Sequence, residues 1–280
     1  MSAGGGGLAV VATPIGNLED CSPRAAAALR AADVVACEDT RRSATLLRAV
    51  DSRAPMVSLH AHNEASRLPE LVGRMLGGER VALVSDAGMP GVSDPGARLV
   101  SAAHEAGIPV EVLPGPSAVT AAVAAAGAPA DRFVFAGFMP RKNGERTTLL
   151  DDLDRTACTI VGFESPQRLP DLLTYLAARH PERRAAVCRE LSKLHEETVV
   201  ATCAELADRM TGPARGEITF VLWPAAPVAP GAGDLERVVA VLVGAGLSSG
   251  SAADAAVALG AGTRNAAYRA AIAAASRRDT

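Results

Sequence analysis

Short apolar runs alternate with alanine-rich segments of helical spacing through the first half of the chain. The runs have the length of strands that are buried on both faces. We expect strands at residues 8–12, 33–37, 56–59, 81–84 and 109–113. We expect helices at residues 23–32, 68–76 and 97–106, and a fourth that ends near Gly127 with Ser117 as a candidate N-cap. This alternation predicts a mostly parallel sheet with helices on both faces.

The pattern changes after residues 127–131, a Gly-Ala-Pro-Ala-Asp segment that indicates a domain boundary. Strands are then expected at residues 133–136, 159–163, 185–188, 198–201 and 217–223. Helices are expected at residues 144–153, 169–178 and 204–210. The spacing predicts a second, mixed and largely antiparallel sheet. The fold class is therefore α/β, with two α/β domains.

The same patterns divide the whole chain. We expect a flexible tail at residues 1–7, an N-terminal α/β domain at 8–127, a C-terminal α/β domain at 128–224, a linker at 225–233 and a helical segment at 234–280. Ser251 and Thr263 are candidate caps in that last segment, which has three short helices and Gly260–Gly262 between the last two. The arrangement resembles a helix-turn-helix, and a docking or dimer-forming appendage fits the pattern equally well.

Composition and charge exclude several classes of protein. The chain is 49% hydrophobic, but no apolar run reaches the roughly 20 residues of a membrane span. Residues 1–7 lack the basic start and apolar core of a signal peptide, so we expect a cytoplasmic protein with no membrane contact. The five cysteines are odd in number and show no CxxC spacing, which favours reduced thiols. With a net charge of −3, binding to nucleic acid would need local basic patches.

The loop at residues 85–96 (SDAGMPGVSDPG) is the most informative stretch of the chain. It follows a predicted strand and contains three glycines, two prolines and two aspartates. Glycine lets a backbone approach a ligand closely, proline fixes the shape of a loop, and open α/β sheets bind ligands at the carboxyl ends of their strands. The loop at residues 13–17 belongs to the same edge of the sheet. The two loops predict a cradle for a nucleoside-like ligand, with ordinary turn chemistry as the alternative.

Other strand ends carry ionisable side chains. His60, His62 and Glu64 would share one face if the third strand extended through them. Such a face has the residue types that bind zinc, but no further zinc-binding residues are evident. We therefore expect these side chains to form a polar cleft wall, with no metal. The segment at residues 38–42 (EDTRR) follows the second strand and could contact a substrate or form surface ion pairs.

Two groups of basic side chains could neutralise phosphates. Lysine occurs at only two positions among the 28 basic residues, one in each group. For the second group, a solvated face balanced by nearby glutamates is an equal alternative. The groups are Arg141, Lys142 and Arg146 near the domain boundary, and Arg183, Arg184, Arg189 and Lys193 further along.

Eight segments carry a resemblance to a known family when they are taken together and in order. They are residues 12–20, 38–41, 58–64, 85–96, 113–118, 163–168, 189–196 and 216–218. The chain from about Leu8 to Trp223 closely resembles the ribosomal RNA small subunit methyltransferase I family, within the tetrapyrrole methylase superfamily. The C-terminal helices resemble those of the family more loosely.

The resemblance implies an enzyme that uses S-adenosylmethionine as methyl donor, without a metal, in the cleft between two α/β domains of a homodimer. It implies 2′-O-methylation of a cytidine ribose in the decoding region of 16S rRNA. Donor-binding residues are expected at Pro14, Gly16, Ser85, Asp86, Ala87, Gly88, Val92, Ser93, Ser117, Ala118, Phe163 and Glu164. Glu64, His62 and Lys193 are candidate general bases, and Arg41, Arg141, Lys142 and Arg168 are candidate RNA contacts.

Two other functions stay open from the sequence. One is methylation of a tetrapyrrole or another small molecule by the same fold. The other is a non-enzymatic protein, in which a nucleotide-binding domain is fused to a DNA-binding helix-turn-helix. The arginine groups and the additional helices favour RNA, whereas the stiff loops around one cleft argue against a binding protein without chemistry.

Overall fold

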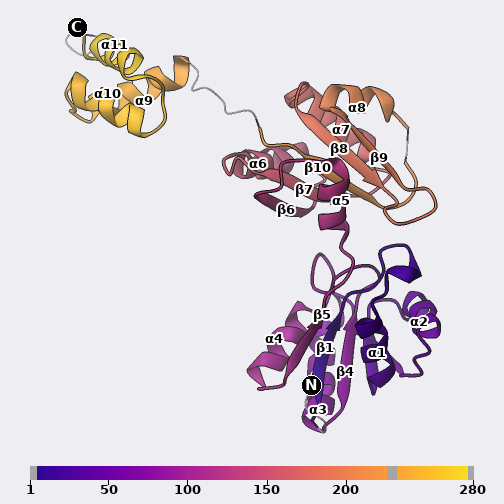
Figure 1. Cartoon of the computed structure of the whole chain (residues 1–280). Coiled ribbons are helices and arrows are strands. Elements are labelled where there is room, and N and C mark those ends of the chain that lie inside the picture. Colours follow the sequence, from indigo (N-terminus) through magenta and orange to yellow (C-terminus); the bar gives the residue numbers. More distant parts are fainter. Residues whose placement is uncertain (1–4, 213, 226–231, 277–280) are drawn as a thin grey trace. The chain divides into compact units, whose positions relative to one another are not determined.

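The computed structural model describes residues 5–212, 214–225 and 232–276, and the chain divides into two compact units, Met1–Pro224 and Ala225–Thr280 (Figure 1). The flexible tail expected at residues 1–7 and the linker expected at 225–233 fall mostly outside the described residues. At the described edges of both segments, regular structure extends further than expected. The first strand already begins at Gly7, and the first C-terminal helix begins at Ala232.

The first sheet has five parallel strands in the order β3-β2-β4-β1-β5. The strands are β1 (Gly7–Val11), β2 (Val34–Cys37), β3 (Met56–Ser58), β4 (Arg80–Val84) and β5 (Val110–Leu113). The helices are α1 (Pro23–Ala31), α2 (Thr40–Ala49), α3 (Glu64–Leu76) and α4 (Ala97–Glu105), with a short 3-10 helix at Leu18–Asp20. The expected parallel sheet is confirmed.

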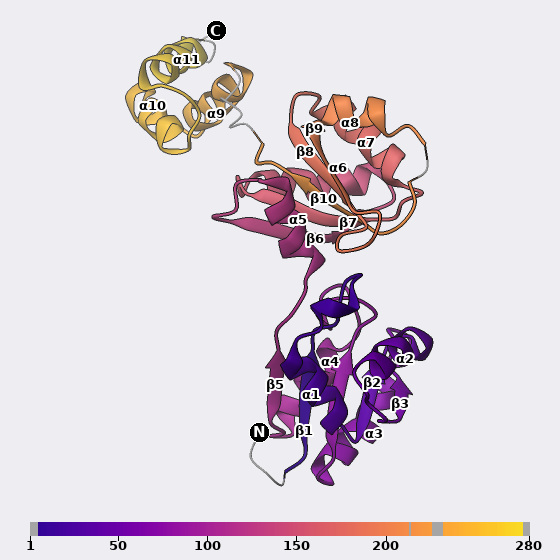
Figure 2. The same cartoon turned by 45° about the vertical axis from the view of Figure 1, so that its right-hand side comes forward.

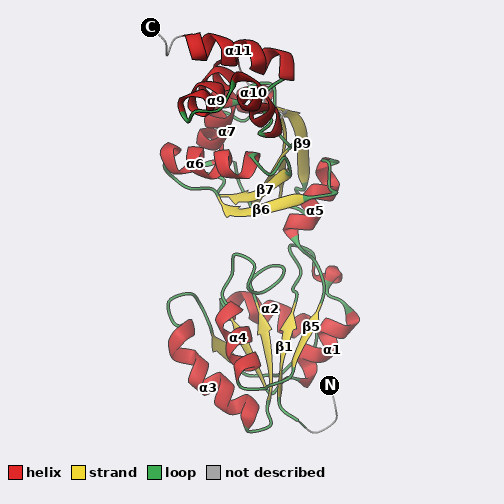
Figure 3. Ribbon diagram, turned by 90° about the vertical axis from the view of Figure 1, so that its left-hand side faces the viewer, coloured by secondary structure: helices red, strands yellow, loops and turns green. Residues whose placement is uncertain are grey.

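Helices cover both faces of this sheet, and successive strand residues enter opposite cores (Figure 3). Leu8 and Val10 of β1 pack in one core with Leu71 and Leu99 of α3 and α4. Val11 packs in the other core with side chains of α1 and α2. Strands buried on both faces explain why the sequence shows continuous apolar runs and no alternation.

Two local features of this domain differ from expectation. Helix α2 was not expected. Three of its ten residues are arginines, and they leave too few apolar residues to show helical spacing. It begins where the Asp39 carboxylate accepts the Arg41 N–H at 2.8 Å. Helix α3 begins at Glu64, four residues early, because the Asn63 side chain accepts the His60 N–H at 2.8 Å and donates to Ser58 O at 3.1 Å. This turn ends the third strand before His60.

The second sheet has the order β6-β7-β10-β8-β9, in which β6 and β7 are parallel and the other pairs antiparallel. It is therefore mixed and largely antiparallel, as expected. The strands are β6 (Phe133–Phe138), β7 (Thr159–Glu164), β8 (Arg184–Arg189), β9 (Glu197–Thr202) and β10 (Ile218–Leu222). The helices are α5 (Ala118–Ala126), α6 (Asn143–Asp154), α7 (Leu169–Arg179) and α8 (Cys203–Arg209).

Helices α6, α7 and α8 pack on one face of this sheet, and α5 packs on the other (Figure 2). Ser117 stands at the N-cap position of α5, but its side chain makes no capping hydrogen bond. The helix ends at Gly127, whose φ of 64° is left-handed and suits glycine.

The C-terminal unit contains the three expected helices, α9 (Ala232–Gly244), α10 (Ser249–Ala258) and α11 (Arg264–Ser276). Alanines and valines form its core, including Val239, Ala253 and Ala267. Helix α10 is capped by Ser248, whose Oγ accepts the Ser251 N–H at 3.2 Å, so Ser251 is not the cap. Thr263 Oγ1 accepts the Ala266 N–H at 3.4 Å, as a cap of α11 would. No helix in the described ranges is long and apolar enough to cross a membrane.

Candidate active site

A cavity of about 400 Å³ lies within the first unit. Its wall includes residues that follow β1, β2 and β4, at the carboxyl edge where open α/β sheets bind ligands. Residues of both α/β domains contribute. The wall is formed by Ile15, Glu38, Arg42, Asp86–Met89, Val92–Asp94, Ser117–Val119, Phe138, Phe163–Pro166, Cys188, Leu191 and Gly216–Thr219.

Backbone hydrogen bonds hold the two glycine- and proline-containing loops together. The Thr13 N–H donates to Gly88 O at 2.8 Å, and the Gly88 N–H donates to Thr13 O at 3.1 Å. Ser85 Oγ donates to the same Gly88 carbonyl at 3.3 Å. Gly88 has a φ of 81°, which a residue with a Cβ rarely adopts, and Ser93 is left-handed as well. Ser93 has a Cβ, so its left-handed backbone is strained, and strain of this kind concentrates at functional sites.

One side of the cavity is strongly acidic. Asp86 pairs with Arg42 at 3.4 Å, and its other oxygen accepts the Asp39 N–H at 3.1 Å. Burial raises the pKa of Glu38, and the nearby Asp86 charge adds to the shift. Burial, followed by the Glu38 charge, raises the pKa of Asp94 to about 6, although a hydrogen bond from Ser85 opposes the shift. A cationic ligand would relieve this repulsion.

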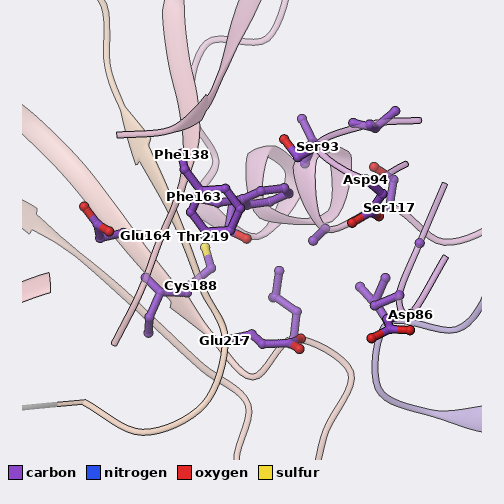
Figure 4. A pocket seen from close by; sticks show the side chains of 18 of the residues that line it. Asp86, Ser93, Asp94, Ser117, Phe138, Phe163, Glu164, Cys188, Glu217 and Thr219 are labelled. Atoms are coloured by element: carbon purple, nitrogen blue, oxygen red, sulfur yellow. The ribbon is translucent and has the colours of Figure 1, made fainter. Parts of the chain in front are cut away.

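The other side of the cavity is aromatic. The rings of Phe138 and Phe163 meet edge to face, with their centroids 5.5 Å apart. Figure 4 shows these rings together, with the carboxylates of Asp86 and Asp94 across from them. The cavity therefore offers an apolar surface and a negative surface to the same ligand.

Glu164 is a buried carboxylate on the wall of the cavity. Its side chain is fully buried, and Oε1 accepts the Ser165 N–H at 2.7 Å and pairs with Arg168. Oε2 has no hydrogen-bond partner in the described parts of the chain. Buried carboxylate oxygens are normally hydrogen-bonded, so Oε2 is an unsatisfied acceptor behind the wall of the cavity.

Lys193 lies beside the cavity and is held by two carboxylates. Its Nζ donates to Glu190 Oε1 at 2.7 Å and to Glu217 Oε2 at 3.1 Å. Partial burial lowers the pKa of Lys193, but the hydrogen bonds to both glutamates outweigh burial and raise the pKa above its ordinary value. A lysine base would need a lowered pKa, and the structure shows the opposite shift.

Nine of the twelve expected donor-binding residues line the cavity: Asp86, Ala87, Gly88, Val92, Ser93, Ser117, Ala118, Phe163 and Glu164. The other three, Pro14, Gly16 and Ser85, are not part of the wall. Ser85 is buried and shapes the loop through its bond to Gly88. Gly16 packs on Lys193, because a Cβ on Gly16 would lie 2.3 Å from Lys193 Cγ.

Two of the candidate bases lie away from the cavity. The Glu64 carboxylate accepts the Gly96 N–H at 3.0 Å and the Arg98 N–H at 3.1 Å, so it caps the start of α4. His62 is exposed, with its ring 6.0 Å from that of His60. The early turn at Asn63 therefore separates side chains that an extended strand would have aligned. Among the described residues, no group of three or more potential metal ligands is found.

The candidate RNA contacts fall into two groups. Arg41 is 92% exposed and pairs with Asp39, whereas Arg42, about 100° further around α2, faces the cavity. Lys142 is exposed and pairs with Glu145 at 3.4 Å. Arg141 and Arg168 line a second cavity, described below.

Several residues of the site were missed by sequence reasoning. Glu38, Asp94 and Glu217 lie within segments that we had singled out, and Glu38 belongs to the segment that could contact a substrate, but none of the three was named as a site residue. Their loops meet only in the folded chain. Phe138 ends an ordinary apolar strand, and no sequence signal marks it as a cavity residue.

Asp94 should make the stability of the ligand-free protein depend on pH. Because its pKa is raised from 3.8 to about 6 in the folded state, the native protein holds this proton more tightly than the unfolded chain does. Raising the pH from about 4 to about 6 should therefore lower the free energy of unfolding. Urea unfolding over this pH range should show a smaller decline for Asp94→Asn. If the free energy of unfolding fell equally with pH in the parent and in Asp94→Asn, Asp94 would not be the group responsible.

Comparison with known proteins gives matches over most of the chain. A family model for tetrapyrrole (corrin/porphyrin) methylases matches residues 7–207. The ribosomal RNA small subunit methyltransferase I of Mesorhizobium japonicum is 44% identical over 265 residues, which cover 94% of this chain and 90% of that protein. The protein of the same name from Mycobacterium bovis is 46% identical over 228 residues, 79% of each chain.

Solved structures of methyltransferases share the fold. The methyltransferase CobJ aligns with a TM-score of 0.61 at 21% identity, over 79% of this chain and 95% of that one. Uroporphyrin-III C-methyltransferase from Thermus thermophilus, in complex with S-adenosyl homocysteine, aligns with a TM-score of 0.55 at 21% identity, over 78% and 97% of the two chains.

Proposed function

The chain belongs to the tetrapyrrole methylase family, alongside the ribosomal RNA small subunit methyltransferase I proteins, and from this premise we propose that it methylates small-subunit ribosomal RNA. We propose S-adenosylmethionine as the donor and the 2′-hydroxyl of a cytidine in the decoding region of 16S rRNA as the acceptor. The observation that carries the proposal is the 44% identity over 94% of the chain. The solved uroporphyrin-III C-methyltransferase from Thermus thermophilus, which is named for a tetrapyrrole substrate, is 21% identical.

The residues on the cavity wall suit this donor. A volume of about 400 Å³ is in the range of small-molecule sites. The acidic side, with Asp86 and Asp94, suits a sulfonium and an ammonium, and the left-handed Gly88 lets backbone approach a ligand. When bound, the donor supplies an electrophilic methyl group on its sulfonium.

The protein must then position the 2′-hydroxyl of the acceptor and remove its proton. Orientation of a 2′-hydroxyl against the methyl group is the larger contribution in such a displacement. A general base adds roughly 10²–10⁴ in rate. Lys193 is held as a cation by its two glutamates. We therefore propose that a carboxylate of the wall, Asp94 or Glu217, accepts the proton.

A methyl-transfer assay on isolated small ribosomal subunits tests the proposed function. Labelled methyl groups should appear in 16S rRNA, and mapping of the product should place them on one cytidine ribose. Large subunits and a uroporphyrin serve as alternative acceptors. Methylation of the porphyrin alone, or of no acceptor, would contradict the proposal.

Arg141 and Lys142 are proposed to contact RNA phosphates. Replacing both with alanine should reduce the slope of log affinity against log salt by about 0.7 for each lost contact to single-stranded RNA. The affinity for S-adenosylmethionine should not change. Arg155→Ala is a suitable control, because this arginine is 77% exposed beyond the far end of α6. A slope equal to that of the parent would assign both residues to the solvated surface.

We also propose a cytoplasmic homodimer. Small ribosomal subunits are assembled and used in the cytoplasm, which supports the location. Leu194 is 93% exposed in the loop that carries Lys193, and a second copy of the chain could cover this apolar side chain. Light scattering should give the mass of two chains, and the mass of one chain would contradict the dimer.

A further inference from the structure

A second cavity, of about 580 Å³, adjoins the first and is built within the C-terminal α/β domain alone. It is lined by Phe138, Met139, Pro140, Arg141, Ser165 and Arg168. Phe138 and Ser165 belong to the walls of both cavities. A ligand in the second cavity would therefore lie directly beside one in the first.

The backbone of β6 directs an aromatic ring into this cavity. The pairing of β6 with β7 shifts register between Phe135 and Phe138, and Gly137 between them has a φ of 68°. Irregularities of this kind re-aim a side chain and are common beside active sites. Phe138 remains 57% exposed, although Phe163 supports its ring from one side. A large exposed ring on a fixed support is suited to stacking with a planar group.

Arg141 supplies an uncompensated positive charge at the same place. Its guanidinium makes no hydrogen bond or ion pair with any residue that the structure describes. The turn that carries it is fixed by Arg146, which is buried and donates to Pro140 O at 2.7 Å and to Asp171 at 2.7 Å. Arg168 adds a second guanidinium, which pairs with the Glu164 of the first cavity.

We propose that this second cavity binds one nucleotide of single-stranded RNA next to the methylated nucleotide. Phe138 stacks with its base, and Arg141 binds the adjacent phosphate. A ring face and an unpaired guanidinium are the two groups with which proteins hold unpaired RNA. The proposal rests on the proposed function, since it places this nucleotide beside a target that lies in the first cavity. The Glu164–Arg168 ion pair then links the walls of the two cavities.

Steady-state methylation of small ribosomal subunits by Phe138→Ala and Arg141→Ala tests the proposal. Loss of base stacking should raise KM for the subunits by about fivefold or more. Phe138→Trp should restore KM, whereas Phe138→Leu, which is apolar but has no ring, should not. Phe133→Ala and Arg155→Ala are matched controls, because they remove a ring and a cation that lie outside the cavity. Arg141→Ala should keep the donor affinity of the parent, since Arg141 is absent from the wall of the first cavity.

Binding of a short single-stranded oligoribonucleotide, followed by fluorescence anisotropy, separates this proposal from the proposed function. If the parent binds the oligonucleotide in a Phe138-dependent way but methylates no ribosomal RNA, the proposed function fails and the subsite stands. If the parent methylates subunits and Phe138→Ala keeps its KM, the subsite is wrong and the function stands. A change in donor affinity alone for Phe138→Ala would also overturn the subsite.

Discussion

Gly88→Val should bind S-adenosylmethionine about 10- to 100-fold more weakly than the parent, equivalent to roughly 1–3 kcal/mol of backbone strain. The strain arises because Gly88 has a φ of 81°, which a β-branched residue avoids. The nearest atom to an added Cβ is Ile15 Cγ2, at 3.5 Å, so backbone conformation and not lack of space is the main obstacle. Relief of the strain would break the paired hydrogen bonds to Thr13 and separate the two loops.

Gly78→Val is the matched control for this prediction. Gly78 has a φ of 95° with no atom within 4 Å of an added Cβ. It lies in the turn before β4, at the opposite end of that strand from the cavity. Both variants should lose thermal stability, but only Gly88→Val should lose affinity in a calorimetric titration with the donor. Equal donor affinities for the two variants would show that the cradle is elsewhere.

Gly216→Ala should lower kcat/KM for methylation by about tenfold or more, as expected when charged hydrogen bonds worth roughly 1.5–3 kcal/mol are disrupted. A Cβ on Gly216 would lie 2.3 Å from Glu190 Cδ, and the φ of 88° adds strain. Glu190 must therefore move, although its Oε1 accepts both the Glu217 N–H at 2.9 Å and Lys193 Nζ at 2.7 Å. The change would release Lys193 and the cavity carboxylate of Glu217 together.

Gly107→Ala controls for backbone strain in the second prediction. Gly107 has a φ of 68° and open space around an added Cβ, in the turn between α4 and β5. Steady-state methylation and thermal melting should be measured for both variants. If Gly216→Ala melts like Gly107→Ala and methylates at the parental rate, the Glu190–Lys193–Glu217 cluster does not shape the site.

The architecture could be predicted from the sequence because it depends on local pattern. Apolar runs separated by helical segments leave a parallel sheet as the arrangement that buries every run. The loops at residues 13–17 and 85–96 had to meet, since the carboxyl ends of parallel strands share one edge. The two loops do meet, through the hydrogen bonds between Thr13 and Gly88.

Side-chain direction was harder to predict. A shift of one residue in the position where a helix or strand begins changes the direction of every side chain in it. Arg41 was expected to contact RNA and is exposed, whereas the start of α2 at Thr40 turns its neighbour Arg42 toward the cavity. Glu64 and His62 would have shared a strand face if the third strand had extended through them, but the side chain of Asn63 closes a turn that begins α3. Hydrogen bonds made by single side chains decided both outcomes.

The sequence by itself determined the two sheets, their strand directions and the loops that form the cavity, because each depends on periodicity within a few residues. Only the tertiary structure brought together the carboxylates of Glu38, Asp94 and Glu217, which come from loops far apart in the chain. The raised pKa values of Glu38 and Asp94 exist only because burial and mutual repulsion act at short range in the folded protein. The exposed ring of Phe138 likewise follows from a register shift against β7, a property of the strand pair that neither strand carries alone.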